Sequence, residues 1–439
     1  MTESGCTHFL NEEISLGNWP TENWWEKFED PTLNQLIATA IEKSPTLKKA
    51  EARFKGAFQI ALQKKAKLYP EIDFNAEDNW QHLSRDGLFR AFGNAYPPII
   101  NQVDIGFNFN YEFDFWGKNR DLFQASLGRA FALEAEQKQA ELILTTSIAY
   151  TYFQAQFLLV KLDLLGNMET NTKKLLQITK QREKHALDTA FDRIQSTTEL
   201  LDVQKELLET EESLRRKIHE LKALSGLGQD VALELEIGPL RKQRLSLPQD
   251  LSLSLLTRRP DLVAQVRRVE AFALEIEAAK TDFYPNINLV AIAGIETLKG
   301  GLLDVVKNFS GSFAPILSLP IFTAGRLRAQ LYEKVAAFDE AVHGYNELIL
   351  RAAQQVANSV TSLQFLEKEL LKELSIYKEA DLNYTLTKAR VDHALNALPS
   401  LIQVDNERLK KELSVKLIAY MQALIDIELI YALGGGYKP

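Results

Sequence analysis

Residues 103–115 alternate apolar and polar side chains without interruption, and a helical pattern follows them directly. Every odd position is apolar and every even position is small or polar. This period of two predicts a strand with two unlike faces, and roughly ten tilted strand residues can cross a bilayer. We therefore expect a membrane strand with lipid on its apolar face. The expected lipid-facing residues are Val103, Ile105, Phe107, Phe109, Tyr111 and Phe113.

The plan of the chain occurs twice. Residues 42–74 match residues 257–289 at one constant shift, which aligns Pro45 with Pro260. Further along the chain, at a slightly smaller shift, Gly226 aligns with Gly434. Each copy has the pattern of a helix, two strands, a very long helix and a last helix. We therefore predict two internal repeats.

Periodicity and turn residues predict the element bounds. An N-terminal extension covers 1–29, repeat 1 covers 30–225, a linker covers 226–249, repeat 2 covers 250–433 and a tail covers 434–439. In repeat 1 we expect a helix over 31–68 that is interrupted at Ser44-Pro45, strands over 71–81 and 102–115, and helices over 118–187 and 192–225. In repeat 2 we expect strands over 286–296 and 311–322 and helices over 326–395 and 400–433.

The expected helix lengths predict how the helices are arranged. At 1.5 Å per residue, helix 118–187 is roughly 105 Å long, and helices 31–68 and 192–225 are roughly 57 and 51 Å long. Two short helices stacked end to end therefore match one long helix, which predicts a cylinder wall with the linker and both termini near its middle. A seam of leucines spaced seven apart indicates coiled-coil packing in this wall. These leucines are Leu200, Leu207, Leu214 and Leu221.

Four strands in one chain are too few to close a barrel, because closure around an interior needs roughly eight or more. Open sheet edges are not tolerated in lipid, so we expect the strands to be shared between chains. Two chains would leave a nearly filled interior, whereas three would leave a passage. Pro315 and Pro320 each remove a hydrogen-bond donor from the fourth strand, which predicts an edge to the next chain or a bulge.

Charge and cysteine content limit the partners. A net charge of −8 argues against nucleic acid or anionic lipid headgroups as the main partner. Cys6 is the single cysteine, so an internal disulfide is excluded. Cys6 is also a candidate lipidation site, but the preceding MTESG lacks a basic region and an apolar stretch. A thiol without function is an equally supported interpretation.

The sequence contains no pattern typical of an enzyme. It has no phosphate-binding glycine loop, no zinc-ligand spacing and no nucleophile motif, so we expect no catalytic residue, cofactor or metal. His185 and His393 occupy matching positions in the two repeats, but no other ligand type clusters beside them, which favours a surface role. Phe115-Trp116 at the strand end is typical of an aromatic girdle at a membrane interface.

Four segments resemble signature segments of the outer-membrane factor family, the TolC-like exit ducts of bacterial efflux pumps and type I secretion. They are FDFWGKNR (113–120), RRPDL (258–262), DFYPNINL (282–289) and LPIFTAGRLRAQ (319–330). The likeness covers about residues 19–434 and is strongest to the NodT-type lipoprotein branch. It implies a mostly α fold with a small β part: a homotrimeric β-barrel, with four strands from each chain, and a long α-helical barrel.

The resemblance also implies a function. It implies a passive duct in the bacterial outer membrane that spans into the periplasm and exports small molecules such as drugs or toxic compounds. Its implied partners are outer-membrane lipid, a periplasmic adaptor protein and an inner-membrane pump. The alternative is a coiled-coil scaffold of the cell envelope, which explains the leucine seam but leaves the apolar strand face without a partner.

A gate at the helix turns near 188–192 and 396–400 is a further implication of the resemblance. Where the family commonly has glycine in this turn, the chain has Ala186 and Ala394, for which we expect a more rigid or more helical turn. Asp188 and Asp192 are expected equally as helix caps. The candidate gate residues are Asp188, Asp192, Asp392, Pro399, Gln403 and Asp405.

Overall fold

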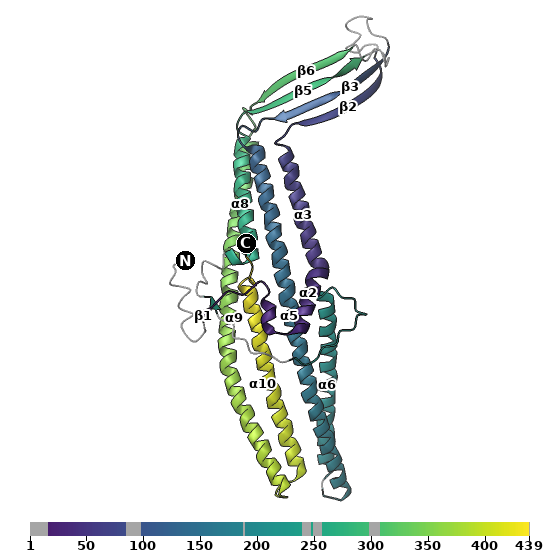
Figure 1. Cartoon of the computed structure of the whole chain (residues 1–439), viewed down its shortest axis with the longest axis vertical. Coiled ribbons are helices and arrows are strands. Elements are labelled where there is room, and N and C mark those ends of the chain that lie inside the picture. Colours follow the sequence, from purple (N-terminus) through teal and green to yellow (C-terminus); the bar gives the residue numbers. More distant parts are fainter. Residues whose placement is uncertain are drawn as a thin grey trace. The chain divides into compact units, whose positions relative to one another are not determined.

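Figure 1 shows a computed structural model of the chain, which is mostly helical with one four-stranded sheet. The structure describes residues 16–84, 98–187, 189–238, 247–248, 257–297 and 308–438. The described residues form two compact units: unit 1 lies within 1–51, 135–263 and 346–439, and unit 2 within 52–134 and 264–345. Each unit therefore combines parts of both repeats.

The two repeats fold into helices of equal length, which supports the predicted duplication. The helices α3 (Pro45–Ala66) and α8 (Pro260–Thr281) have 22 residues each, α5 (Lys118–Lys184) and α9 (Arg326–Asp392) have 67 each, and α6 (Ala190–Leu224) and α10 (Leu398–Ala432) have 35 each. The strands β2 (Glu71–His82) and β5 (Asn286–Thr297) have 12 each, whereas β3 (Ile99–Glu112) has 14 and β6 (Phe309–Ser318) has 10.

Glycines at matching positions close both repeats. Gly226 after α6 and Gly434 after α10 have positive φ angles of 68° and 87°, which glycine adopts without strain. A Cβ atom on Gly434 would lie 2.1 Å from the carbonyl oxygen of Arg258, and one on Gly226 would lie 3.2 Å from that of Lys43. The ends of α6 and α10 therefore contact the backbone just before the paired prolines, as the duplication requires.

Unit 2 contains the four-stranded sheet, whose order is β2-β3-β5-β6 with all neighbours antiparallel. The hairpin β2–β3 belongs to repeat 1 and the hairpin β5–β6 to repeat 2. They join between β3 and β5, where Val103 pairs with Thr297. Because β2 and β6 are the outer strands, each has one side without a partner strand in the described chain.

Unit 1 has its main core where the N-terminal segment meets the helices. Trp24, in the short 3-10 helix η2 (Trp24–Phe28), is 1% exposed and packs edge-to-face on Trp25 and Phe28. Asp30 caps the next helix, α2 (Pro31–Lys43), and accepts a hydrogen bond of 2.7 Å from the Tyr152 hydroxyl. The strands β1 (Leu16–Gly17) and β4 (Leu247–Pro248) pair in parallel and tie this segment to the linker.

The leucine seam of α6 packs against other helices. Leu207 packs on a cluster that contains Leu164 and Met168 of α5 and Leu409 of α10, and Leu221 is fully buried in the main core. The prediction that this seam is packing is therefore confirmed for these positions. None of the described helices carries an apolar stretch long enough to cross a membrane.

Several elements end earlier or begin earlier than the sequence predicts. The strand expected over 102–115 runs from Ile99 to Glu112, and the strand expected over 311–322 ends at Ser318 because Pro320 and a left-handed Ala324 follow. The long helices expected to reach 187 and 395 end at Lys184 and Asp392. The helices expected from 192 and 400 begin at Ala190 and Leu398. They begin earlier because the residues that follow the N-cap already have helical backbone angles.

Candidate functional site

The sheet has one apolar face that continues across all four strands. The strand register places the even positions of β2 and the odd positions of β3, β5 and β6 on this face. Phe107, at its centre, pairs with Phe74 on one side and Ala293 on the other. Many of its large side chains are exposed: Ile72, Phe74, Trp80, Ile99, Phe107, Phe309, Phe313 and Leu317. A soluble protein rarely leaves so continuous an apolar surface uncovered.

The opposite face of the sheet is mostly polar. It carries the odd positions of β2 and the even positions of β3, β5 and β6. Its polar side chains are Glu71, Asp73, Asn75, Glu77, Asn79, Gln81, Gln102, Asp104, Asn108, Asn110, Glu112, Asn286, Asn288, Glu296, Ser310, Ser312 and Ser318. A sheet with these two faces can separate hydrocarbon from water.

The structure places the predicted lipid-facing residues on the apolar face, with one difference. Val103, Ile105, Phe107, Phe109 and Tyr111 alternate along β3 on this face. Phe113 lies just beyond the end of β3, although its N–H still donates to the carbonyl of Ile287 over 3.0 Å. The Phe113 ring packs edge-to-face on Tyr111 and stacks on Phe115, so the aromatic surface continues past the strand.

The predicted girdle residues lie where the strands lead into the helices. Trp116 is 52% exposed, and its indole Nε1–H donates to the carbonyl of Pro285 over 2.7 Å. Its ring lies 5.1 Å from the ring of Tyr284. A tryptophan with an exposed ring and a satisfied N–H suits a membrane interface.

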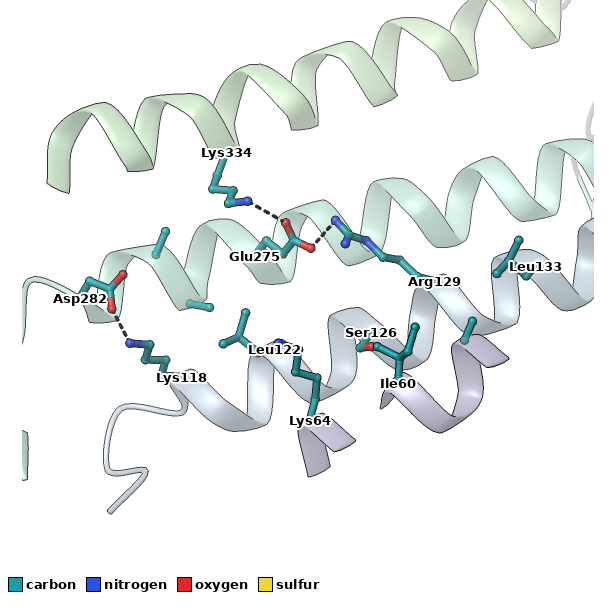
Figure 2. Close-up of a pocket in the computed structure, with 13 residues that line it drawn as sticks. Ile60, Lys64, Lys118, Leu122, Ser126, Arg129, Leu133, Glu275, Asp282 and Lys334 are labelled. Atoms are coloured by element: carbon teal, nitrogen blue, oxygen red, sulfur yellow. Dashed lines mark ion pairs between the residues drawn. The ribbon is translucent and has the colours of Figure 1, made fainter. Parts of the chain in front are cut away.

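Ion pairs below the sheet hold α8 between two other helices of unit 2, as Figure 2 shows. Glu275 of α8 is buried and forms ion pairs with Arg129 of α5 and, over 3.4 Å, with Lys334 of α9. Lys118 of α5 pairs with Asp282 over 2.7 Å. These paired residues line a cavity of about 520 Å³, together with Lys64 of α3.

The two helix turns of unit 1 have the same backbone geometry. Ala186 after α5 and Ala394 after α9 are left-handed, with φ angles of 59° and 56°. The N–H of Leu187 donates to the carbonyl of Arg182 over 2.8 Å, and that of Leu395 to Arg390 over 2.7 Å. This is the pattern of a Schellman cap, which usually contains glycine. The expectation that alanine makes the turn more helical is therefore wrong, because alanine accepts the left-handed conformation here.

Asp192, a candidate gate residue, caps a helix. Its carboxylate accepts hydrogen bonds of 2.9 and 2.7 Å from the backbone N–H and the hydroxyl of Thr189. These hydrogen bonds lower the pKa of the Asp192 carboxyl below its ordinary value. The charged carboxylate therefore stabilises the first turn of α6.

Asp405, another candidate gate residue, belongs to a network between helices. It accepts a hydrogen bond of 2.7 Å from Asn171 of α5 and pairs with Arg408 over 2.9 Å. The Arg408 guanidinium lies 5.0 Å from the ring of Tyr384 in α9. Asp405 thus links three helices.

The other candidate residues have fewer contacts or lie outside the described residues. Asp392 ends α9 and is exposed, and Gln403 is exposed on α10. Pro399 stands in the first turn of α10, where its missing N–H costs nothing. Asp188 and Cys6 lie outside the described residues. No group of three potential metal ligands occurs in the described chain, including around His185 and His393.

Asp426 is a buried acid that the sequence analysis missed. It is 8% exposed on α10, and burial raises the pKa of its carboxyl to about 7. The neighbouring Ile427 and Ile430 belong to the main core of unit 1. A single acid among the apolar residues of a helix matches no motif. Its position between two isoleucines was the sequence's one indication that it is buried.

We expect Asp426 to make stability fall with pH. Because its folded pKa is raised, the unfolded state loses the proton first, so stability falls as the pH rises from about 4 to about 7. Asp426→Asn should flatten this dependence and raise stability at pH 8 by on the order of 2 kcal/mol. Denaturant unfolding at pH 5 and pH 8 measures both effects. An equal fall with pH in Asp426→Asn would contradict the assignment, and the exposed Asp392→Asn serves as control.

Comparison with known proteins places these features in a family. The family model described as Outer membrane efflux protein matches residues 36–227 and 251–434. The chain is 28% identical over 440 residues to the multidrug resistance outer membrane protein MdtP of Shigella flexneri, with 98% of this chain and 90% of that protein covered.

Solved structures agree with this match. The outer membrane protein VceC of Vibrio cholerae is similar with a TM-score of 0.83 and 30% identity, covering 96% of this chain and all of that chain. The CmeC outer membrane channel of Campylobacter jejuni is similar with a TM-score of 0.90 and 20% identity, covering 98% of this chain and 91% of that chain.

Proposed function

Because this chain belongs to the outer membrane efflux protein family and is an efflux channel of the bacterial outer membrane, we propose that three copies share one closed sheet in that membrane. Channels of this family are trimers that work with efflux-pump partners. In this proposal the helices extend the passage into the periplasm. The channel is passive and receives small toxic compounds from an inner-membrane pump through a periplasmic adaptor.

The observation that carries the proposal is a sheet with one apolar face and with two edges that pair with no other strand in the described part of the chain. In hydrocarbon, the unpaired N–H and C=O groups of β2 and β6 would have no water to bond. Pairing β6 of one copy with β2 of the next satisfies these groups. Three copies give twelve strands, which leaves room for a passage, whereas two copies give eight and a nearly filled interior.

The apolar face is the lipid-facing wall in this arrangement. Val103, Ile105, Phe107, Phe109 and Tyr111 contact hydrocarbon, and Phe113 lies at the end of this row. Phe115 and Trp116 lie at the interface with the periplasm. The polar face, which includes Asn108 and Asn110, then lines the water-filled passage. The alternative of a coiled-coil scaffold gives this apolar face no function.

The gate of the channel lies at the two helix turns in this proposal. Asp392 and Gln403 are the candidate residues whose exposed side chains are available to line a constriction. Asp192 affects the constriction by capping α6, and Asp405 affects it through its hydrogen bond with Asn171. Pro399 fixes the start of α10. Asp188 is a candidate from its position in the sequence alone. The same turns are the proposed contact with the adaptor.

Three measurements test the proposal. Cross-linking of the detergent-solubilised protein should give a trimer, and the trimer should conduct ions across a planar bilayer. Expression in a strain that lacks its own channel of this family should restore drug resistance when the cognate pump and adaptor are present. A monomer that stays in solution without detergent and gives no conductance would contradict the proposal.

A further inference from the structure

An open groove of about 370 Å³ lies at the end of the sheet where the second repeat changes from helix to strand and back. It is lined by the last turn of α8, by the turn that leads from α8 to β5, and by the first turns of α9. Asn286, which begins β5, pairs with Ser318, which ends β6, so both chain crossings lie at the same end of the sheet. The lining residues are Lys280, Phe283, Tyr284, Arg328, Leu331 and Tyr332.

The groove combines two cations with exposed aromatic rings. Lys280 pairs with Glu277 over 2.7 Å, but both side chains are about half exposed, so this pair is weak and readily replaced. No described residue forms an ion pair with Arg328. Tyr284 and Tyr332 are 49% and 69% exposed. The groove therefore offers an available guanidinium and ammonium beside phenol and hydrocarbon surface.

Aromatic side chains lie at the groove and at the end of the apolar face. Tyr111 near the end of β3 and Phe113 and Phe115 just beyond it form a row of ring contacts, with centroids 4.8 and 5.5 Å apart. Trp116 follows directly in the chain and contacts Tyr284 in the groove over 5.1 Å. Exposed aromatic rings therefore lie both beside the cations of the groove and at the end of the apolar face.

We propose that this groove binds the headgroup of an anionic phospholipid in the periplasmic leaflet of the outer membrane. The inference rests on the proposed function, because it requires the sheet to cross that membrane. Arg328 matches a phosphate with two parallel N–H donors, and Lys280 adds a second charge. The tyrosines suit the headgroup level, and Phe283 and Leu331 contact the start of the acyl chains.

This inference concerns one local site, whereas the expectation drawn from net charge concerns the main partner of the whole chain. The chain carries −8 overall, which argues against anionic headgroups as the main partner. Yet the helix ends next to the sheet are rich in cations, including Lys64, Lys65 and Lys67 at the end of α3. Since a surface potential falls off within a Debye length, the local cations decide the interaction.

Native mass spectrometry of the trimer from mixed micelles tests the proposal. With equal amounts of phosphatidylglycerol and phosphatidylcholine, the wild-type trimer should retain more phosphatidylglycerol. Lys280→Gln with Arg328→Gln should reduce this preference by about fivefold for each cation removed. The matched control is Lys205→Gln with Arg216→Gln, which removes the same charges from exposed positions on α6 and should keep the preference.

The outcomes separate this inference from the proposed function. Equal retention of both lipids by a wild-type trimer that conducts ions would overturn the headgroup site and leave the channel intact. An unchanged preference in the Lys280→Gln/Arg328→Gln variant would also overturn it. Failure of the wild-type protein to form a trimer or to conduct would instead count against the proposed function.

Discussion

Phe107→Arg should prevent the chain from accumulating in the outer membrane as a trimer. Phe107 lies at the centre of the apolar face, is 57% exposed and pairs with Phe74 and Ala293. An arginine on the lipid face near the bilayer midplane costs roughly 2–4 kcal/mol, so three copies cost roughly 6–12 kcal/mol per trimer. Quantification of the protein in outer-membrane fractions, together with drug susceptibility, measures the loss.

The neighbouring residue supplies a control for this prediction. Asn108→Arg adds the same side chain one residue further along β3, but on the polar face, where Asn108 pairs with Asp73. An arginine there meets water and a carboxylate, so membrane accumulation should stay near the wild-type level. Equal tolerance of both arginines would show that the apolar face does not contact lipid.

The sheet was predictable because its pattern is local. Alternation over 103–115 identified the two faces, and the matching segments around Pro45 and Pro260 identified the repeat. The side-chain period of a strand then fixes every residue on its face once the strand is placed. The strand ends were less predictable, because they depend on turns such as the left-handed Ala324, which no apolar pattern marks.

The contacts of the candidate gate residues were not predictable. Asp192 and Asp405 are both acids near a turn in the sequence, but Asp192 bonds to Thr189 of its own helix, whereas Asp405 bonds to Asn171 more than two hundred residues away. Ala186 and Ala394 led to a wrong expectation, because the left-handed conformation costs a residue with a Cβ atom only about 1–2 kcal/mol. A pair of hydrogen bonds and helix packing can offset such a cost.

The two repeats carry different side chains just before the paired prolines. The sequence identified the second of these segments only as a motif. Arg259, in the RRPDL segment, takes the position of Ser44 in repeat 1. It is 3% exposed and binds both carboxylate oxygens of Asp261 over 3.1 and 2.7 Å. It also donates to the side chain of Gln355 over 2.9 Å and to the carbonyl of Ala432 over 3.0 Å. One guanidinium thus joins the start of α8, the middle of α9 and the end of α10.

We expect Arg259→Ala to lower the stability of unit 1 by about 3–5 kcal/mol. The substitution leaves the Ala432 carbonyl at the end of α10 without this donor and removes the partner of a mostly buried carboxylate. Arg259→Lys keeps the charge but loses the planar fork, so it should recover only part of the loss. Denaturant unfolding of the solubilised protein, followed by tryptophan fluorescence and limited proteolysis, measures the change.

The adjacent arginine tests whether the effect belongs to the network or to charge alone. Arg258 lies 5.0 Å from the ring of Trp19 and makes a cation–π contact, so Arg258→Ala should cost only about 1 kcal/mol. If both alanine variants lost the same small amount, the network around Arg259 would not hold the helices together. A large loss for Arg259→Ala alone would show that RRPDL joins α8 to the middle of α9 and to the end of α10 by hydrogen bonds.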